Sequence, residues 1–196
     1  MSNVIAVSGA SGLVGSKLVT ALKSSGHQVR PMVRSSGAGG PEVILWDLTR
    51  GVVNPERMKG VDTIIHLAGE NIASGRWNSA IKERIRNSRV QGTRSLVNSL
   101  RASDSRPTTL VCASAIGFYG NRGDEVLAES AAAGKGFLAD VCSEWEAEAM
   151  KAEELGIRVV CVRIGVVLSR QGGALAKMLL PFKLGAGGIV GNGRQY

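Results

Sequence analysis

The stretch VIAVSGASGLVGSKLVTALKSSG, at residues 4–26, decides the fold. It begins with a short apolar run at residues 4–8, which predicts a buried strand. It continues at residues 16–25 with apolar residues on one face, which predicts a helix. Between the two segments lie three glycines: Gly9, Gly12 and Gly15. Glycine at such a turn lets one backbone approach another backbone or a ligand.

The rest of the chain alternates between strand-like and helix-like segments. Further strands are predicted at residues 28–34, 42–46, 61–67, 109–113 and 158–162. Further helices are predicted at residues 77–100 and 137–155. Strands separated by helices favour a parallel sheet with helices on both faces. The sequence therefore predicts an α/β fold with a doubly wound, mostly parallel sheet, which is a Rossmann fold.

Composition and charge narrow the class of partner. The chain has 196 residues and a formal net charge of +8, which fits nucleic acid, anionic membranes or phosphate-bearing small molecules. It has no Lys/Arg-rich tail and no basic patch interleaved with aromatic residues, so we expect no nucleic-acid partner. No apolar run approaches membrane-spanning length, so we expect no membrane partner. We favour a small-molecule substrate, with a nucleotide-linked one among the options, and leave an oligomer open.

Cysteine and histidine usage points to a cytoplasmic protein without a metal site. The three cysteines are Cys112, Cys142 and Cys161, an odd number without CxxC spacing, which is typical of reduced thiols. No signal-peptide pattern opens the sequence. The two histidines, His27 and His66, are far apart and have no ligand cluster around them, so we predict no metal ion.

The glycine spacing predicts a site for a dinucleotide. In a strand–turn–helix unit, the first glycine permits the tight turn and the second lets backbone N–H groups approach a pyrophosphate. The third lets the helix pack close to the sheet, and the helix N-terminus favours the anion. The predicted cofactor-binding set includes the glycines and the residues around them: Gly9, Ser11, Gly12, Leu13, Val14 and Gly15.

The end of the second predicted strand favours NADP over NAD. An NAD site needs an acidic residue there for the ribose 2′-hydroxyl, whereas this chain has Val33, Arg34 and Ser35 and no Asp or Glu nearby. An arginine at this position can pair with a 2′-phosphate. The alternative is that Arg34 only solvates a loop.

Several motifs resemble those of the extended short-chain dehydrogenase/reductases. These are SGASGLVG (residues 8–15), WDLT (46–49), IIHLAGE (64–70), SRVQGTRSLV (88–97) and VRIGVVLS (162–169). A closer resemblance is to an atypical branch of that superfamily, labelled epimerase family protein or nucleoside-diphosphate-sugar epimerase. It rests on LAGENI, RWN, SAIGFYG, SEWE and the final GGALAKMLLPFKLGAGGIVGNGRQY.

The resemblance implies further cofactor contacts. Asp47 would contact the adenine amino group, followed by Leu48. Other implied cofactor-lining residues are Leu67, Ala68, Gly69, Arg89 and Val167. Arg89 stands where most extended members have Asn, so its partner stays open among ribose, phosphate and neither.

The catalytic pattern departs from that of the superfamily. Active members use Ser/Thr together with a Tyr-x-x-x-Lys pair, in which the Lys lowers the pKa of the Tyr and holds the ribose. Here the alignment places Phe137 at the Tyr position and Val141 at the Lys position. Phe cannot transfer a proton and Val cannot supply charge.

The remaining candidate catalytic residues are Ser114 and Tyr119. Ser114 best matches the serine that polarises a substrate oxygen, with Ala115 as the alternative equivalent. Tyr119 matches a structural tyrosine of the extended group, and packing at a cleft edge is its competing interpretation. Asp140 and Glu144 lie one helical turn apart and could do acid–base work, although a solvated acidic helix face is the commoner case.

Three functional hypotheses follow. The first is an NADP-dependent oxidoreductase or sugar-nucleotide epimerase of unknown substrate, and the second is an NADP(H)-binding regulatory module that has lost the chemistry. The third, a nucleic-acid binder, is not expected. Residues 1–170 are predicted to form the dinucleotide-binding domain, and residues 171–196 to begin a substrate-side segment. Because relatives of this type continue beyond GNGRQY, we leave open whether the chain is a fragment.

Overall fold

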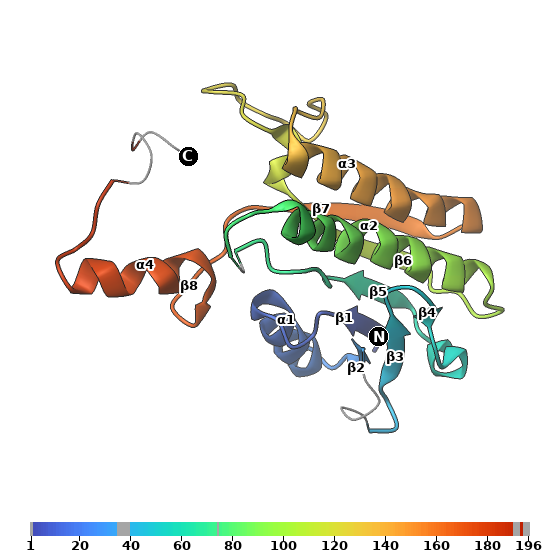
Figure 1. Cartoon of the computed structure of the whole chain (residues 1–196). Helices are drawn as coiled ribbons and strands as arrows, with labels where there is room; N and C mark the ends of the chain where they lie inside the picture. The colour runs from blue at the N-terminus through green and yellow to red at the C-terminus, as the bar shows by residue number, and fades with distance from the viewer. Residues whose placement is uncertain (1, 35–39, 74, 190–192, 194–196) are drawn as a thin grey trace. The chain divides into compact units, whose positions relative to one another are not determined.

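A seven-stranded sheet flanked by helices is the main feature of the fold (Figure 1). The computed structural model describes residues 2–34, 40–73, 75–189 and 193. In chain order the strands are β1 (Val4–Ser8), β2 (Gln28–Val33), β3 (Ile44–Asp47), β4 (Gly51–Val52), β5 (Thr63–His66), β6 (Thr109–Ala115) and β7 (Arg158–Ile164). In space their order is β4-β3-β2-β1-β5-β6-β7. The α/β fold predicted from the sequence is confirmed.

The order of the strands reverses at β1. From β1 the chain runs outward through β2 to β3 and β4, and it then returns to place β5 on the other side of β1. The pairs β1–β2, β1–β5, β2–β3 and β5–β6 are parallel, and β3–β4 is antiparallel. In open sheets of this kind, ligands bind at such a reversal, outside the carboxyl ends of the strands.

Helices cover both faces of the sheet, as predicted. Helix α1 (Leu13–Ser24) packs on β1 and β2, whereas α2 (Ser79–Arg101) and α3 (Phe137–Met150) pack against each other over the opposite face (Figure 1). Among the described residues, short 3-10 helices join these elements: η2 (Pro55–Met58), η3 (Ile116–Tyr119) and η4 (Lys151–Leu155).

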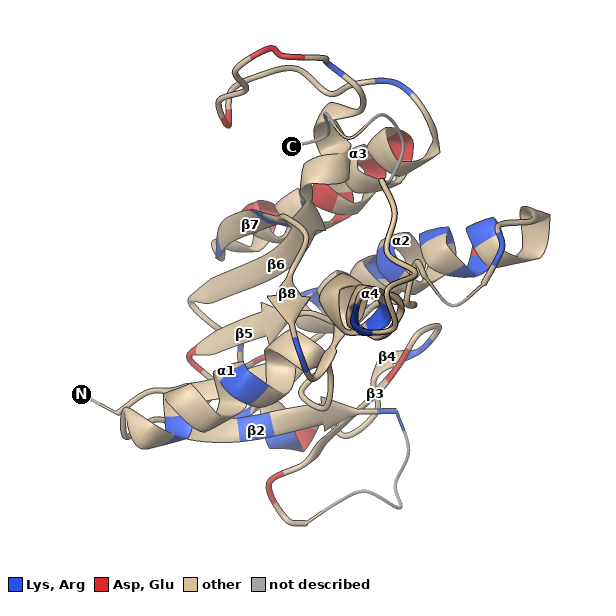
Figure 2. Cartoon of the chain, turned by 90° about the vertical axis from the view of Figure 1, so that its left-hand side faces the viewer, with Lys and Arg blue, Asp and Glu red and all other residues tan. Residues whose placement is uncertain are grey.

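Opposite charges join α2 to α3 and η4. Figure 2 shows basic residues in blue along α2 and acidic residues in red on α3. The ion pairs are Arg86–Glu144, Arg94–Glu148 and Arg101–Glu154. Two of these pairs are well exposed, so they contribute little stability and mainly set how the helices face each other.

Several boundaries differ from the prediction, for local reasons. Helix α1 starts at Leu13, three residues early, because Gly12 is its extended N-cap and Gly15 already lies inside it. Helix α2 starts at Ser79 because the Asn78 side chain accepts a hydrogen bond from the Ile81 N–H at 2.9 Å. The helix predicted at residues 137–155 changes to 3-10 geometry after Met150. Strand β4 was not predicted, because two residues carry no periodicity.

Pro31 is tolerated inside β2 because the strand has a free edge at that point. Pairing between β2 and β3 involves only Met32 and Val33, so at Pro31 the side toward β3 carries no ladder. A proline lacks the N–H that a ladder needs, and it is therefore confined to such edges.

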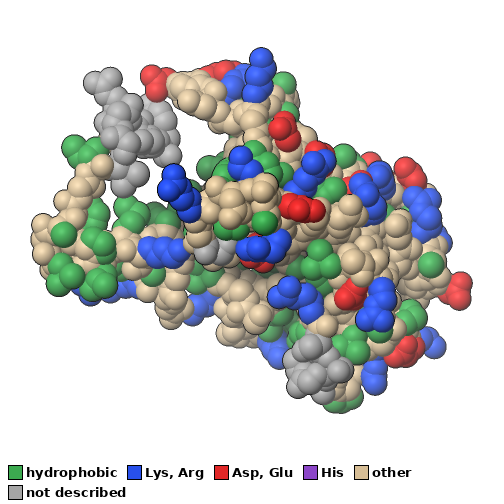
Figure 3. Space-filling model, in the orientation of Figure 1, with side chains coloured by type: hydrophobic (Ala, Val, Ile, Leu, Met, Phe, Trp, Pro, Cys, Tyr) green, Lys and Arg blue, Asp and Glu red, His purple; other side chains and the backbone are tan. Residues whose placement is uncertain are grey.

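The chain divides into two compact units, residues 1–163 and residues 164–196, and the second is described here by itself. It contains β8 (Leu168–Ser169) and α4 (Gly173–Lys183), joined by bridges from Leu168 to Gly173 and from Ser169 to Gly172. Hydrophobic side chains gather on α4 (Figure 3), among them the exposed Leu180 and Phe182. Among the described residues, no helix is both long and apolar enough to cross a membrane.

A buried polar pair, Ser8 and His66, joins the ends of β1 and β5. The Ser8 Oγ lies 2.8 Å from the His66 Nδ1, and the same Oγ accepts hydrogen bonds from the N–H groups of Leu67 (3.1 Å) and Ala68 (3.2 Å). The Ser8 hydroxyl must therefore donate to Nδ1, which assigns the proton of neutral His66 to Nε2. Nε2 has no partner among the described residues, and burial lowers the pKa of His66 to about 4.

We expect His66 to make folding stability depend on pH. Its pKa is lower in the fold than in the unfolded chain, so its contribution is complete above the unfolded value of 6.5. The contribution is lost as the pH falls toward 4. By linkage, His66 should account for a loss of about 2 kcal/mol between about pH 7 and about pH 5.

Urea unfolding at both pH values, compared between the wild type and His66→Asn, measures this loss. Asn can still accept the Ser8 proton but does not titrate, so the variant should lose less stability on acidification. An identical pH dependence in the two proteins would contradict the assignment.

Candidate functional site

The glycine turn closes tightly between β1 and α1. Gly9 has a φ of +68°, which favours glycine, and a Cβ there would lie 2.9 Å from the carbonyl carbon and oxygen of Leu67. A Cβ on Gly15 would collide with the Gly9 carbonyl oxygen. The turn therefore needs glycine at both positions, which agrees with the roles predicted for the first and third glycines.

The first turn of α1 presents free backbone N–H groups. Gly12 N–H donates to the Gly9 oxygen at 2.9 Å, and Ser16 N–H to the Gly12 oxygen at 2.9 Å. Between them, the N–H groups of Leu13, Val14 and Gly15 have no acceptor in the described part of the chain. Free N–H groups and the helix dipole together favour an anion such as a pyrophosphate.

A cavity of about 540 Å³ lies at the carboxyl ends of β1, β2, β3 and β5. It is where the strand order reverses, and the whole of it lies within the unit of residues 1–163. The sequence-predicted residues that line it are Gly9, Ser11, Gly12, Val33, Arg34, Leu48, Leu67, Ala68 and Gly69.

Sequence reasoning missed part of this lining. The additional residues are Ala10, Val19, Pro31, Met32, Trp46, Glu70 and Ser88. Glu70 and Trp46 lie inside motifs that resemble those of the superfamily, and Ser88 is next to Arg89. Their neighbourhood to predicted cofactor-binding residues was the signal that could have identified them. Two other predicted residues cannot be placed in the cavity: Ser35 lies outside the described residues, and Val167 belongs to the second unit.

Asp47 does not line the cavity. Its Oδ1 accepts hydrogen bonds from the Thr49 hydroxyl (2.6 Å), the Thr49 N–H (2.9 Å) and the Arg50 N–H (2.9 Å). These bonds lower the pKa of Asp47 to about 2, the Thr49 hydroxyl having the largest effect. In this structure Asp47 organises the turn between β3 and β4, and its contact with an adenine stays a prediction.

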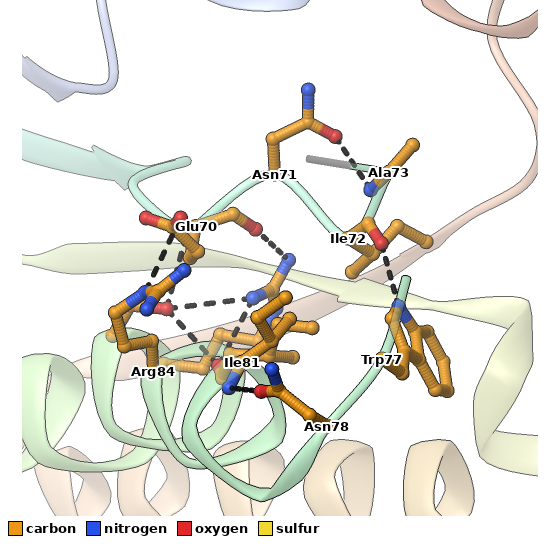
Figure 4. Close-up of polar contacts among 11 residues, drawn as sticks. Glu70, Asn71, Ile72, Ala73, Trp77, Asn78, Ile81 and Arg84 are labelled. Atoms are coloured by element: carbon orange, nitrogen blue, oxygen red, sulfur yellow. Dashed lines mark hydrogen bonds and ion pairs between the residues drawn. The ribbon is translucent and has the colours of Figure 1, made fainter. Parts of the chain in front are cut away.

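The wall formed by residues 67–70 is held from two sides. Ser8 binds the N–H groups of Leu67 and Ala68, as described above. From α2, the Ser88 Oγ accepts from the Glu70 N–H at 2.9 Å, and Arg89 donates to the Glu70 carbonyl oxygen at 3.0 Å. Figure 4 shows Glu70 with the Arg84 side chain beside its carboxylate, 3.9 Å from it. Arg89 itself does not line the cavity.

The two candidate catalytic residues belong to one hydrogen-bond network. Ser114, at the end of β6, donates from Oγ to the Glu146 Oε1 at 2.5 Å. Arg163 of β7 binds both Glu146 oxygens at 2.9 Å, and it also donates to the Tyr119 hydroxyl at 2.9 Å. Glu146 and Arg163 thus connect Ser114 to Tyr119, a role that sequence reasoning did not find.

Pairing with each other keeps the Glu146 carboxylate and the Arg163 guanidinium charged. Burial alone would raise the pKa of the Glu146 carboxyl, but hydrogen bonds from Arg163 and Ser114 hold it below its usual value. The bonds to Glu146 raise the pKa of Arg163. Because the Ser114 proton is directed to Glu146, Ser114 can only accept a hydrogen bond from any further partner.

Helix α3 carries Phe137 and Val141 at the positions that the resemblance assigns to the superfamily's Tyr and Lys. Phe137 packs edge-on against Trp77, with ring centres 5.5 Å apart, and the Lys82 Nζ lies 5.4 Å from the Phe137 ring centre. Val141 is buried. Glu144 forms a surface pair with Arg86 and Asp140 is exposed, which is the solvated acidic face expected as the commoner case.

The sheet order and the cavity at its reversal define a protein of the Rossmann class. The model of the NAD dependent epimerase/dehydratase family matches residues 5–196, and the chain belongs to this family. The resemblance seen in the sequence is therefore confirmed.

Three similar proteins are informative. An epimerase family protein of Mycobacterium bovis is 42% identical over 193 residues, which is 98% of this chain and 63% of that protein. A crystal structure of human epimerase family protein SDR39U1 with NADPH has a TM-score of 0.82 at 32% identity, over 98% of this chain and 63% of that one. A nucleoside-diphosphate sugar epimerase from Corynebacterium glutamicum also gives 0.82, at 37% identity, over 98% of this chain and 40% of that one. The chain thus spans less than two thirds of the length of each.

We expect Gly9→Ala to destabilise the fold more than Gly26→Ala. Both positions have positive φ, but a Cβ at Gly26 meets nothing within 4 Å, whereas a Cβ at Gly9 meets the Leu67 backbone. The backbone strain alone costs about 1 kcal/mol, and the clash raises the loss at Gly9 to roughly 2–4 kcal/mol. Urea unfolding of both variants measures the difference, and equal losses would refute the close approach.

We expect Glu146→Gln to destabilise more than Glu144→Gln. The first change leaves the half-buried Arg163 without its carboxylate, which costs roughly 2–3 kcal/mol after allowance for partial exposure. The second breaks an exposed pair with Arg86 and should cost less than about 1 kcal/mol. Chemical denaturation of the two variants provides the comparison. Similar losses would show that the Glu146–Arg163 pair is no more stabilising than a surface pair.

Proposed function

We propose that the cavity binds NADP(H). Arg34 carries this proposal, because it is an exposed cation on the cavity wall at the end of β2, where an NAD site needs a carboxylate. Among the described residues, Arg34 has no ion pair that would keep it from a 2′-phosphate. The crystal structure of human SDR39U1 with NADPH supports the same cofactor.

The residues present fit a dinucleotide. The free N–H groups of Leu13, Val14 and Gly15 would hold the pyrophosphate, and the absence of a Cβ at Gly9 and Gly12 leaves the turn open to it. Leu48, Leu67 and Ala68 give the cavity apolar walls on either side of β1. When bound, the cofactor supplies hydride chemistry.

For the reaction, we propose an oxidoreductase or epimerase acting on a small-molecule substrate. The likeness to a nucleoside-diphosphate sugar epimerase supports a nucleotide-linked substrate class. Ser114 would accept a hydrogen bond from a substrate hydroxyl, because its own proton goes to Glu146. Tyr119 would donate its proton, because its oxygen already accepts from Arg163. Residues 171–196 would begin the substrate-side segment, and the unpaired Cys112, Cys142 and Cys161 support a cytoplasmic location.

A second candidate function is an NADP(H)-binding regulatory module. The observation that favours it is Phe137, which packs on Trp77 at the position of the superfamily's catalytic Tyr, with buried Val141 at the Lys position. Tight binding of NADPH without turnover on a panel of carbonyl compounds would favour the module over the enzyme.

The test of the cofactor assignment is Arg34→Glu, with Lys23→Glu as a control that makes the same charge change on α1. Loss of a charge-assisted contact with the 2′-phosphate should weaken NADPH binding by roughly 2–3 kcal/mol and leave NADH binding unchanged. Titration of all three proteins with both nucleotides measures this. Equal affinities of the wild type for NADPH and NADH would overturn the assignment.

A further inference from the structure

Two consecutive residues of α2 hold both backbone groups of Glu70. The Glu70 N–H donates to the Ser88 Oγ at 2.9 Å, and the Glu70 carbonyl oxygen accepts from the Arg89 Nη2 at 3.0 Å. Gly69, Glu70 and Ser88 all line the cavity, whereas Arg89 lies behind them. Arg89 therefore supports the cavity wall from outside the cavity.

The Arg89 side chain is itself fixed in place. Its Nη1 donates to the Ile85 carbonyl oxygen at 3.0 Å, and its guanidinium lies 5.3 Å from the ring centre of Trp145 on α3. A Cβ on Gly69 would lie only 3.2 Å from the Arg89 Cζ. The backbone at Gly69 thus rests directly on a planar cation that cannot easily move away.

This cation has no ion-pair partner. In the described part of the chain, no carboxylate lies within 4 Å of the Arg89 guanidinium, and the nearby Glu70 carboxylate lies 3.9 Å from Arg84 instead. Burial lowers the pKa of Arg89 below its usual value. Burying a cation without a counter-ion is unfavourable, and such groups concentrate at functional sites.

The position of Arg89 in the fold places it on the side of β1 where the nicotinamide half of the cofactor would lie. Arg34 follows β2, on one side of β1, whereas the wall of residues 67–70 follows β5, on the other side. A dinucleotide that crosses β1 with its 2′-phosphate at Arg34 would have its nicotinamide half over the β5 side. Behind the wall on that side, Arg89 of α2 supplies a cation, bound to the Glu70 carbonyl.

We propose that Arg89 is a positioning residue that also sets the preference of the site for the reduced cofactor. Through the Glu70 carbonyl, it holds the wall against which the nicotinamide half lies. Its positive charge disfavours the oxidised nicotinamide ring, which is cationic, relative to the uncharged reduced ring. The site thereby selects NADPH over NADP+. This inference rests on the proposed binding of NADP(H).

The experiment measures dissociation constants for NADPH and NADP+ in four variants and the wild type. Arg89→Met removes the charge and the hydrogen bonds, and Arg89→Lys keeps the charge with fewer bonds. Ser88→Ala releases the Glu70 N–H without changing charge. Arg101→Met is the control, because it removes a cation from the exposed end of α2. Urea unfolding of each apoprotein verifies that it is folded under the binding conditions.

We expect the wild type to bind NADPH more tightly than NADP+. Arg89→Met should weaken NADPH binding roughly tenfold or more and should reduce the preference for NADPH by roughly three- to tenfold. Arg89→Lys should weaken both nucleotides but keep the preference, as should Ser88→Ala. Arg101→Met should change neither.

Two results would overturn the inference while leaving the proposed function intact. One is a wild type that binds NADPH and NADP+ equally. The other is an unchanged preference in Arg89→Met, which would make the residue merely structural. If Arg89→Met does not fold, Arg89→Gln provides the same comparison with a neutral hydrogen-bonding side chain. A wild type that binds neither nucleotide would instead refute the proposed cofactor, and this inference with it.

Discussion

The close approach of Gly9 to the Leu67–Ala68 backbone is the contact on which the rest of the site depends. It brings the ends of two neighbouring parallel strands so near that a Cβ would not fit between them. Ser8 strengthens the contact, because its buried hydroxyl accepts both N–H groups that follow β5 and donates to His66. Helix α1 can then begin immediately after the turn, with its free N–H groups beside the cavity. Ladder pairing, glycine conformation and the helix dipole all act at this one point.

Helices α2 and α3, on the opposite face, make different contributions to the structure around the cavity. Helix α2 supports the cavity wall through Ser88 and Arg89, whereas α3 contributes no Tyr or Lys and packs Phe137 against Trp77. What α3 does contribute is Glu146, which joins Ser114 to Arg163 and through it to Tyr119. This polar network spans β6, η3, α3 and β7, and the Glu146–Arg163 ion pair links its members.

Much of the fold was predictable because it depends on short-range patterns. The strand at Val4–Ser8 was predicted at its observed bounds, and every other predicted strand or helix occurs within a few residues of its predicted position. The misses have local causes, such as the Asn78 cap and the two-residue β4. In the site, Gly9, Gly12 and Arg34 could be predicted as cavity residues, because their spacing after β1 and β2 is typical of a dinucleotide-binding fold. Glu146 and Arg163 were not found, because Glu146 is 32 residues from Ser114 and Arg163 is 44 residues from Tyr119.

The sequence by itself determined the strand–glycine–helix unit, the alternation that makes the sheet parallel and the basic residue at the end of β2. These follow from backbone conformation and periodicity, which act over a few residues. Only the tertiary structure decided that Arg89 lies behind the cavity wall, that Asp47 turns its Oδ1 into the β3–β4 turn, and that Ser114 and Tyr119 share one network. The physical reason is that hydrogen bonds and burial depend on which side chains meet in space, and residues far apart in the chain meet only after the sheet has assembled.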